Sequence, residues 1–221
     1  MSLNHSVELI NSDYKTALNE LVTKGTKVDC VIMNPVVGSI LKGDLASNIE
    51  ELAKLLVQVT YNNTHLFCVV HEKNITDILN GMTQGGYTLR DILTIPIVPE
   101  NLPAVYCTLP NRRYFENKGT VQVLHMTVGS GSKLRVTDLV NGENSAIYPA
   151  NWSSWFKGTL IDAYKTMMEI STDHSDIVLD PFMFTGSIGV ACIQQDRKYI
   201  GIEESGHFYR QAKLSLDIVG E

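Results

Sequence analysis

A strand–loop–helix–strand unit near the end of the chain limits the possible folds more than any other segment. An apolar strand is predicted over residues 177–180, and it ends in Asp180. A loop follows, then a helix predicted over residues 188–195, and then a second apolar strand over residues 199–203 that ends in Glu203. In such a unit the two strands are parallel, so both acids and the start of the helix meet at one edge of a sheet. The unit therefore predicts a ligand site at that edge, next to a helix N-terminus.

The rest of the chain alternates predicted strands and helices. Apolar residues at helical spacing predict helices, and short unbroken apolar runs predict strands that are buried on both sides. This order predicts an α/β fold with a doubly wound, mixed but mainly parallel sheet of seven strands. The predicted strands are residues 7–10, 28–33, 65–70, 92–98, 120–127, 177–180 and 199–203, and the predicted helices are residues 14–23, 48–60, 75–82, 156–170, 188–195 and 206–216.

The composition is that of one globular domain over residues 1–221. Of the 221 residues 44% are hydrophobic, and no apolar run approaches the roughly 20 residues of a membrane helix. We expect no export and a cytoplasmic protein, because the first residues lack a basic stretch and an apolar core. Cys30, Cys68 and Cys192 lie in apolar runs and are predicted to be buried and reduced. Neither the cysteines nor the six histidines have metal-ligand spacing, so no metal site is expected.

The acid that ends the second strand suits a nucleoside. A carboxylate has two oxygens with spare lone pairs, so Glu203 can accept hydrogen bonds from both hydroxyls of a ribose. The Gly-x-Gly-x-x-Gly fingerprint of dinucleotide-binding proteins is absent. Gly186 and Gly189 can equally be a loop glycine and a helix-packing glycine. The residues by themselves leave a nucleoside site and an ordinary strand–helix–strand unit as alternatives.

Residues 180–192 resemble a known family. They read Asp-Pro-Phe-Met-Phe-Thr-Gly-Ser-Ile-Gly-Val-Ala-Cys, which is similar to the Asp-Pro-Phe-Met-Gly-Ser-Gly-Thr-Thr-Gly-Val-Ala signature of the amino DNA methyltransferases. Residues 197–203 are similar to that family's next segment, and Phe184 stands where the family has its first glycine. The resemblance implies the fold of S-adenosylmethionine-dependent methyltransferases and S-adenosylmethionine as the cofactor. It assigns cofactor contacts to Asp180, Pro181, Phe182, Thr185, Gly186 and Glu203.

Residues 28–38 resemble the catalytic strand and loop of the same family, which ends in Asx-Pro-Pro-aromatic. An Asx side chain and the carbonyl of the next proline accept the two hydrogens of an exocyclic amine, which points the nitrogen lone pair at the methyl group. The aromatic ring stacks on the extruded base. The resemblance therefore assigns catalysis to Asn34 and Pro35, while Val36 and Val37 replace the second proline and the aromatic residue. A turn after a buried strand is the alternative interpretation.

Two further segments resemble the family. Residues 7–13 are similar to a segment of the family that places an acid near the adenine of the cofactor. In this sequence that acid is Asp13. The alternative interpretation is an ordinary loop aspartate after a strand. Residues 148–153 resemble a stretch that holds the amino-acid end of the cofactor. The catalytic strand precedes the cofactor strand, which resembles the circularly permuted, β-type order of the family. In that order residues 85–148 are the inserted target-recognition region.

The charge distribution bears on the partner. The whole chain has a formal net charge of −6, which argues against a protein that coats nucleic acid. Residues 82–135 hold six basic and three acidic residues, a local net charge of +3 that suits contact with phosphates. Chance charges on a solvated loop are the alternative. Arg112, Arg113 and Lys118 are the predicted DNA contacts.

Together these patterns predict a DNA amino-methyltransferase of the restriction–modification kind, acting on adenine N6 or cytosine N4. The residues Phe184, Val36 and Val37 favour a different class as the alternative, a catalytically degenerate methyltransferase-like module that binds or supports other molecules. A methyltransferase that acts on RNA or on a small molecule is a further alternative.

Overall fold

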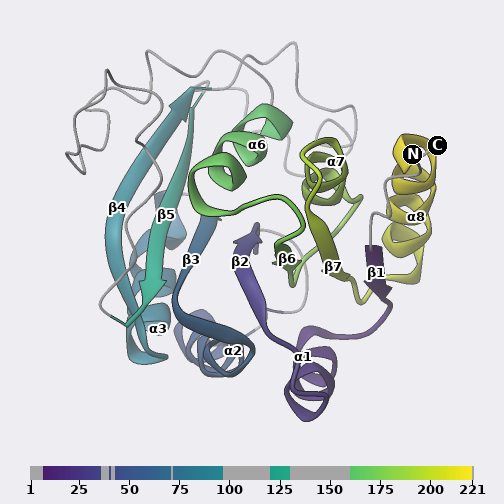
Figure 1. Cartoon of the computed structure of the whole chain (residues 1–221). Helices are drawn as coiled ribbons and strands as arrows, with labels where there is room; N and C mark the ends of the chain where they lie inside the picture. Colours follow the sequence, from purple (N-terminus) through teal and green to yellow (C-terminus); the bar gives the residue numbers. More distant parts are fainter. Residues whose placement is uncertain are drawn as a thin grey trace.

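The computed structural model describes residues 7–35, 40, 43–70, 72–96, 120–129 and 160–220. They form a seven-stranded sheet with helices on both faces (Figure 1). In chain order the elements are β1 (Val7–Ile10), α1 (Tyr14–Thr23), β2 (Val28–Met33), α2 (Leu45–Val59), β3 (Thr60–Val70), the short 3₁₀ helix η2 (Glu72–Asn74), α3 (Ile75–Gln84), β4 (Tyr87–Pro96), β5 (Thr120–Val128), α6 (Leu160–Ser171), β6 (Ile177–Asp180), α7 (Ser187–Gln194), β7 (Lys198–Ile202) and α8 (Gly206–Gly220).

The strand order in the sheet is β1-β7-β6-β2-β3-β5-β4. Neighbouring strands from β1 to β3 are parallel, and β5 is antiparallel to both β3 and β4. The predicted doubly wound mixed sheet is therefore confirmed. The chain moves outwards in one direction from β6 to β7 and in the other from β2 to β3. The switch point between these directions lies between β6 and β2, and ligands bind at such points in open α/β sheets.

The central strands are apolar on both sides because helices cover both faces. Along β2, Val31 and Met33 join the core under α1, α2 and α3, whereas Cys30 and Ile32 join the core under α6, α7 and α8. All four side chains are fully buried. The three cysteines in the described part of the chain are buried free thiols, as predicted.

Two strands begin five residues before their predicted starts. β3 begins at Thr60 rather than at residue 65, and β4 begins at Tyr87 rather than at residue 92. The added residues are largely polar, and they are tolerated because β4 is an edge strand and the start of β3 is partly exposed. A bulge between Leu89 and Asp91 also breaks the regular alternation in β4.

The predicted recognition region of residues 85–148 includes part of this sheet. Its strands β4 and β5 pair with each other, and β5 also pairs with β3 over six residues from Gln122 to Thr127. These two strands therefore belong to the central sheet rather than to a separate insertion. Residues 97–119 and 130–148 lie outside the described residues, so their role in target recognition stays a prediction.

Two buried histidines join β3 to β5. His65 Nδ1 and His125 Nε2 are 2.9 Å apart, and the ring of Phe67 stacks on that of His125 with centroids 4.8 Å apart. Burial lowers the pKa of His65 to about 4 and that of His125 to about 3. Both rings are therefore neutral at pH 7, and one N–H bridges the two nitrogens.

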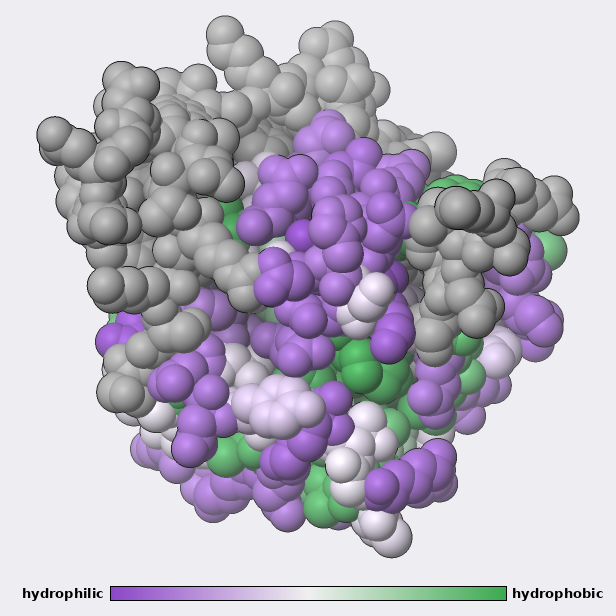
Figure 2. Space-filling view, in the orientation of Figure 1, coloured by the Kyte–Doolittle hydropathy of each residue, from purple (hydrophilic) through white to green (hydrophobic). Residues whose placement is uncertain are grey.

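The described surface carries little apolar area. The face shown in Figure 2 is mainly hydrophilic, with small apolar spots between the polar groups. Among the described residues, the large apolar side chains that are exposed are Tyr61, Ile92 and Leu214, which lie on three different elements. Within the described ranges no helix combines the length and the apolar character that a membrane span needs.

Candidate active site

A pocket lies at the carboxyl edge of the sheet, where the segments after β1, β6 and β7 meet. Its volume is about 130 Å³. Aromatic rings, small polar groups and two acids form its wall, and no basic side chain is among the described residues that line it. These residues are Ser12, Tyr14, Pro181, Phe182, Phe184, Ile202, Glu203, Glu204, Ser205 and Phe208. The pocket therefore lies at the edge where the spacing of Asp180 and Glu203 predicts a ligand.

Glu203 follows β7 and links the two loops around the pocket. Its Oε2 accepts a hydrogen bond from the Phe184 N–H at 2.9 Å, and its Oε1 accepts one from the Ser205 N–H at 2.8 Å. Burial raises the pKa of this carboxyl above its usual range. Each carboxylate oxygen has a second lone pair, so Glu203 can still accept hydrogen bonds from a ligand.

The loop after β6 has an unusual backbone at two positions. Phe184 has φ of 51° and Gly186 has φ of 87°, both in the left-handed region. Glycine adopts this region freely, whereas a residue with a side chain pays roughly 1–2 kcal/mol. The loop is held in place because the Met183 N–H donates to the Ile202 carbonyl at 2.8 Å and the Phe184 N–H donates to Glu203.

The Phe184 ring forms part of the pocket wall. It is 8% exposed, and it packs on the ring of Phe208 from α8 with centroids 4.0 Å apart. Pockets for ligands of nucleoside size and above usually enclose about 300–1,000 Å³. The pocket here is smaller, at about 130 Å³.

Asp180 lies beneath the pocket and is not part of its wall. Its Oδ1 accepts a hydrogen bond from the Phe182 N–H at 3.1 Å, and its Oδ2 accepts one from the Tyr199 hydroxyl at 3.0 Å. The side chain is fully buried, and burial raises its pKa to about 7. Asp180 thus fixes the start of the loop from inside. A direct contact between Asp180 and a ligand stays a prediction.

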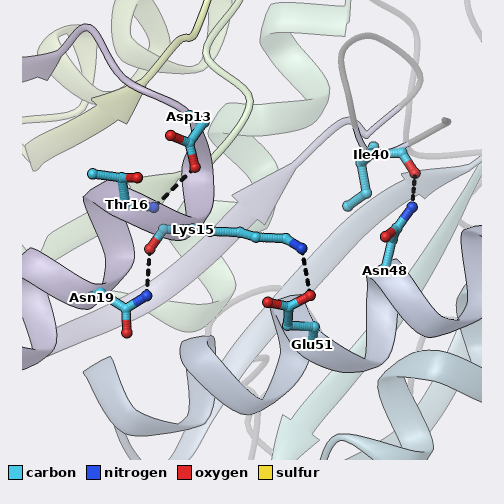
Figure 3. A network of polar contacts seen from close by, with 7 residues as sticks. All are labelled: Asp13, Lys15, Thr16, Asn19, Ile40, Asn48 and Glu51. Atoms are coloured by element: carbon cyan, nitrogen blue, oxygen red, sulfur yellow. Dashed lines mark hydrogen bonds and ion pairs between the residues drawn. The ribbon is translucent and has the colours of Figure 1, made fainter.

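The segment after β1 contributes residues that differ from the predicted one. Asp13 caps α1, because its Oδ1 accepts a hydrogen bond from the Thr16 N–H at 3.0 Å (Figure 3). This bond lowers the pKa of Asp13. Asp13 is exposed, and its neighbours Ser12 and Tyr14 line the pocket instead.

Asn34 and Pro35 follow β2 at the same edge of the sheet. Both are buried, and Asn34 is 9% exposed. β2 pairs in parallel with β6 through Cys30 with Val178 and Val31 with Leu179, so the two strands end next to each other.

Side chains of α1 and α2 fix the start of α2, which follows this segment in the chain. The Asn48 side chain of α2 donates to the Ile40 carbonyl at 3.1 Å, and Lys15 of α1 is bonded to Glu51 of α2 at 2.5 Å (Figure 3). These contacts tie α2, which follows the loop, both to the loop itself and to the segment beside the pocket.

The other predicted site residues are distributed as follows. Pro181 and Phe182 line the pocket, and Thr185 and Gly186 belong to its loop without being part of the wall. The predicted DNA contacts and two of the diverged loop positions lie outside the described residues, as does the segment of residues 148–153. These are Arg112, Arg113, Lys118, Val36 and Val37.

Sequence comparison finds a partial match to the DNA methylases. A family model described as DNA methylase matches residues 162–214, from α6 into α8, which is less than half of the chain. A stretch of 33 residues is also 58% identical to the type II methyltransferase M.Cfr9I of Citrobacter freundii. That stretch covers 15% of this chain and 11% of the length of M.Cfr9I.

Solved DNA methyltransferases share the fold of this chain over nearly its whole length. The crystal structure of M1.HpyAVI superposes with a TM-score of 0.67 at 19% identity, over 96% of this chain and 99% of that one. The complex of M1.HpyAVI with S-adenosylmethionine gives a TM-score of 0.68 at 19% identity, over 95% and 100% of the two chains. The cytosine-N4-specific PvuII DNA methyltransferase gives 0.65 at 14% identity, over 97% and 91%. The predicted methyltransferase type of sheet is thereby confirmed.

Proposed function

We propose that this protein transfers a methyl group from S-adenosylmethionine to an exocyclic amine of a base in DNA, adenine N6 or cytosine N4. The observation that carries the proposal is the adjacency of two strand ends. β2, which leads into Asn34 and Pro35, pairs with β6, whose loop forms the pocket. A methyl donor in the pocket and an amine at Asn34 would therefore meet between neighbouring strands, at the switch point of the sheet.

The chemistry of the pocket supports this donor over a nucleotide. Glu203 and Glu204 contribute carboxylates, and the described lining residues include no basic side chain. Carboxylates repel phosphate groups and attract the positive sulfonium and ammonium groups of S-adenosylmethionine. Tyr14 and Phe182 offer aromatic surface for adenine. The cofactor supplies the methyl group, while Glu203 holds the ribose and Asp180 supports the loop from beneath.

Asn34 and Pro35 would orient the acceptor. The side-chain oxygen of Asn34 and the carbonyl of Pro35 accept the two hydrogens of the amine. This arrangement fixes the nitrogen lone pair in the direction of the methyl group, and it stabilises the positive charge that develops on nitrogen as the new bond forms. Because Asn34 is buried, its hydrogen bond to the amine is little weakened by water.

DNA is the proposed substrate because the family model that matches residues 162–214 is that of the DNA methylases. The predicted phosphate contacts are Arg112, Arg113 and Lys118, in the locally basic part of an acidic chain. Phosphate contacts of this kind position the duplex without reading its sequence, so binding is expected to weaken as salt is raised. Action on DNA also agrees with the cytoplasmic location expected from the sequence.

The decisive experiment separates donor binding from transfer. Calorimetry with S-adenosylmethionine should show binding, and tritiated methyl groups should pass to unmethylated DNA. Asn34→Ala should lower the transfer rate by about 100-fold or more, with donor and DNA affinities changed by less than about twofold, because the lost bond belongs to the transition state. Asn19→Ala, the same change at an exposed position of α1, is the control. Transfer that survives Asn34→Ala would contradict the mechanism.

A specific observation favours a second candidate, a methyltransferase-like module that no longer catalyses. The Phe184 ring occupies pocket space, and the pocket encloses about 130 Å³. This candidate predicts that neither the wild-type protein nor the Phe184→Gly variant binds S-adenosylmethionine. Donor binding by either protein together with transfer to DNA would exclude it.

A further inference from the structure

One tyrosine of the pocket wall has a buried hydroxyl that the sequence does not single out. Tyr14 is the first residue of α1 and is 5% exposed. Its ring packs against that of Phe182 with centroids 5.6 Å apart, and it lines the pocket. Within the part of the chain that the structure describes, its hydroxyl oxygen is buried without a hydrogen-bond partner.

Such a group is unfavourable in a folded protein unless something binds it. A buried donor without a partner costs roughly 1–3 kcal/mol, and unpaired groups of this kind are rare. A phenylalanine would make the same ring contact with Phe182 without that cost. The hydroxyl of Tyr14 therefore needs an explanation other than packing.

The surroundings of Tyr14 define the role that its hydroxyl can play. Burial raises the pKa of Tyr14 to about 12, and the nearby carboxylates of Glu51, Asp13 and Glu204 add to this shift. The hydroxyl is thus protonated at neutral pH and is available as a donor. Glu203 in the same pocket is an acceptor, so the wall offers both kinds of partner to a ligand with hydroxyl donors and ring-nitrogen acceptors.

We infer that the Tyr14 hydroxyl is a ligand-binding group, which donates a hydrogen bond to an acceptor atom of the methyl donor bound in this pocket. The inference rests on the proposed function, because it takes S-adenosylmethionine as the ligand. It adds a positioning contact from the β1–α1 connection to those of the β6 loop and the end of β7. Three strands, rather than two, then determine how the donor lies.

The chain offers a matched control. Tyr87 at the start of β4 is also buried, at 2% exposure, and its hydroxyl makes no hydrogen bond of normal geometry in the described residues, although the Thr60 side chain is near enough to lower its pKa. It packs in the core beneath α2 and α3, and β4 is the edge strand opposite β1. Tyr87 does not line the pocket, so Tyr87→Phe removes the same atom from another buried tyrosine without changing the pocket wall.

The experiment measures the affinity for S-adenosylhomocysteine by calorimetry, and the thermal unfolding of each ligand-free protein. Tyr14→Phe should weaken binding by about 3- to 10-fold, the value of one hydrogen bond. Its melting temperature should be unchanged or higher, because no hydrogen bond is lost in the ligand-free protein. Tyr87→Phe should leave the affinity unchanged. If the wild-type affinity is too low to measure, both changes are made in the Phe184→Gly background.

Equal affinities of Tyr14→Phe and its parent protein would overturn the inference and leave the proposed function intact. A loss of the same size in Tyr87→Phe would also overturn it, because the effect would then be unrelated to the pocket. Absence of binding by both the wild-type protein and Phe184→Gly would overturn the proposed function, and this inference with it.

Discussion

The two sides of the candidate site differ in how they depart from the family pattern. The donor side is the loop after β6 together with the end of β7, and the acceptor side is the end of β2. The main departure on the donor side is Phe184, which has a left-handed backbone and is held by contacts with Glu203 and Phe208. The acceptor side keeps Asn34 and Pro35, but valines follow at positions 36 and 37. One departure lies in the wall of a pocket, whereas the other replaces the aromatic residue that the resemblance assigns to base stacking.

This difference means that donor binding and base capture can fail independently. A narrowed pocket lowers donor affinity but leaves the amine-orienting groups in place. The absence of an aromatic ring lowers the affinity for a flipped base but leaves the affinity for the methyl donor unchanged. Substitutions on each side therefore test whether the two functions are separable, and they begin with the two acids of the donor side.

The largest effect is expected on stability, from Asp180→Asn. Asp180 has a pKa of about 7 in the folded protein and about 3.8 when unfolded. The unfolded chain therefore loses this proton first, and the folded protein becomes less stable as pH rises from about 4 to 7, by as much as ~4 kcal/mol. Asparagine removes this dependence; its oxygen can still accept from the Phe182 N–H, and its amide nitrogen can donate to the Tyr199 hydroxyl. Urea unfolding at pH 4.5 and 7.5 should show that the free energy of unfolding of the variant, relative to that of the wild type, is higher at pH 7.5 than at pH 4.5.

Donor affinity should hardly change in Asp180→Asn, since the side chain lies beneath the pocket. A large loss of affinity would show that Asp180 contacts the donor directly, as the family resemblance implies. It would then belong with Glu203 rather than with the supporting residues.

Glu203→Ala should have the next largest effect, a loss of donor affinity of about 100-fold. The variant removes the proposed partner of the ribose hydroxyls and also frees the Phe184 and Ser205 amides. Hydrogen bonds to charged groups contribute about 1.5–3 kcal/mol each, and the loss of one or two accounts for this factor. Calorimetry with S-adenosylhomocysteine measures it, and Glu204→Ala removes a neighbouring carboxylate as the control. Equal losses in the two variants would argue against a specific role for Glu203.

Phe184→Gly should tighten donor binding by about 10-fold. The variant removes the ring from the pocket and puts glycine where φ is positive, which relieves roughly 1 kcal/mol of backbone strain. It also loses the contact with Phe208, so the ligand-free protein is expected to be slightly less stable. Phe184→Ala is the informative comparison, because it frees the same space without relieving the backbone. An affinity that does not rise in either variant would show that the ring does not restrict the pocket.

Val37→Tyr should have the smallest effect, about a fivefold gain in base capture. It restores a stacking surface, and base–aromatic stacking is worth about 1 kcal/mol at its lower end. The gain should appear in the affinity for DNA with an unpaired target base and should leave donor affinity unchanged. A change in donor affinity instead would mean that the two sides are not separable.

Much of the fold was predictable because its physical basis is local. The run of residues 28–33, apolar except for Asp29, is typical of a strand with helices on both faces, and it forms β2 with both faces covered. The position of the pocket followed from the spacing of Asp180 and Glu203, since parallel strands bring their ends together. The starts of β3 and β4 were missed because polar residues at a sheet edge carry no periodic signal.

The details of the site depend on contacts between distant residues, which the sequence pattern does not contain. Asp180 ends β6, and Glu203 directly follows β7, so the two acids look alike in the sequence. In the structure Asp180 accepts a hydrogen bond from the buried Tyr199 hydroxyl and lies beneath the pocket, whereas Glu203 lines it. Phe208 lies within the predicted helix of residues 206–216, and its contact with Phe184 is visible only in the structure. Tyr14 begins an amphipathic helix, and nothing in the sequence distinguishes it from the apolar residues that pack against the core. Each of these roles depends on which way a side chain points, and that is decided by tertiary packing.

The histidine pair between β3 and β5 has a consequence for how the protein unfolds in acid. Both rings are neutral in the folded protein, and acid would place two positive charges 2.9 Å apart inside the sheet. As pH falls from about 6.5 towards 4, the unfolded chain takes up these protons before the folded one does, so the folded protein loses stability over this range. The parallel strands β1, β7, β6, β2 and β3, which carry the pocket and Asn34, lie on one side of that boundary, and the β4–β5 hairpin lies on the other. We therefore expect mild acid to separate β5 from β3, while the parallel strands that carry the pocket and Asn34 remain paired.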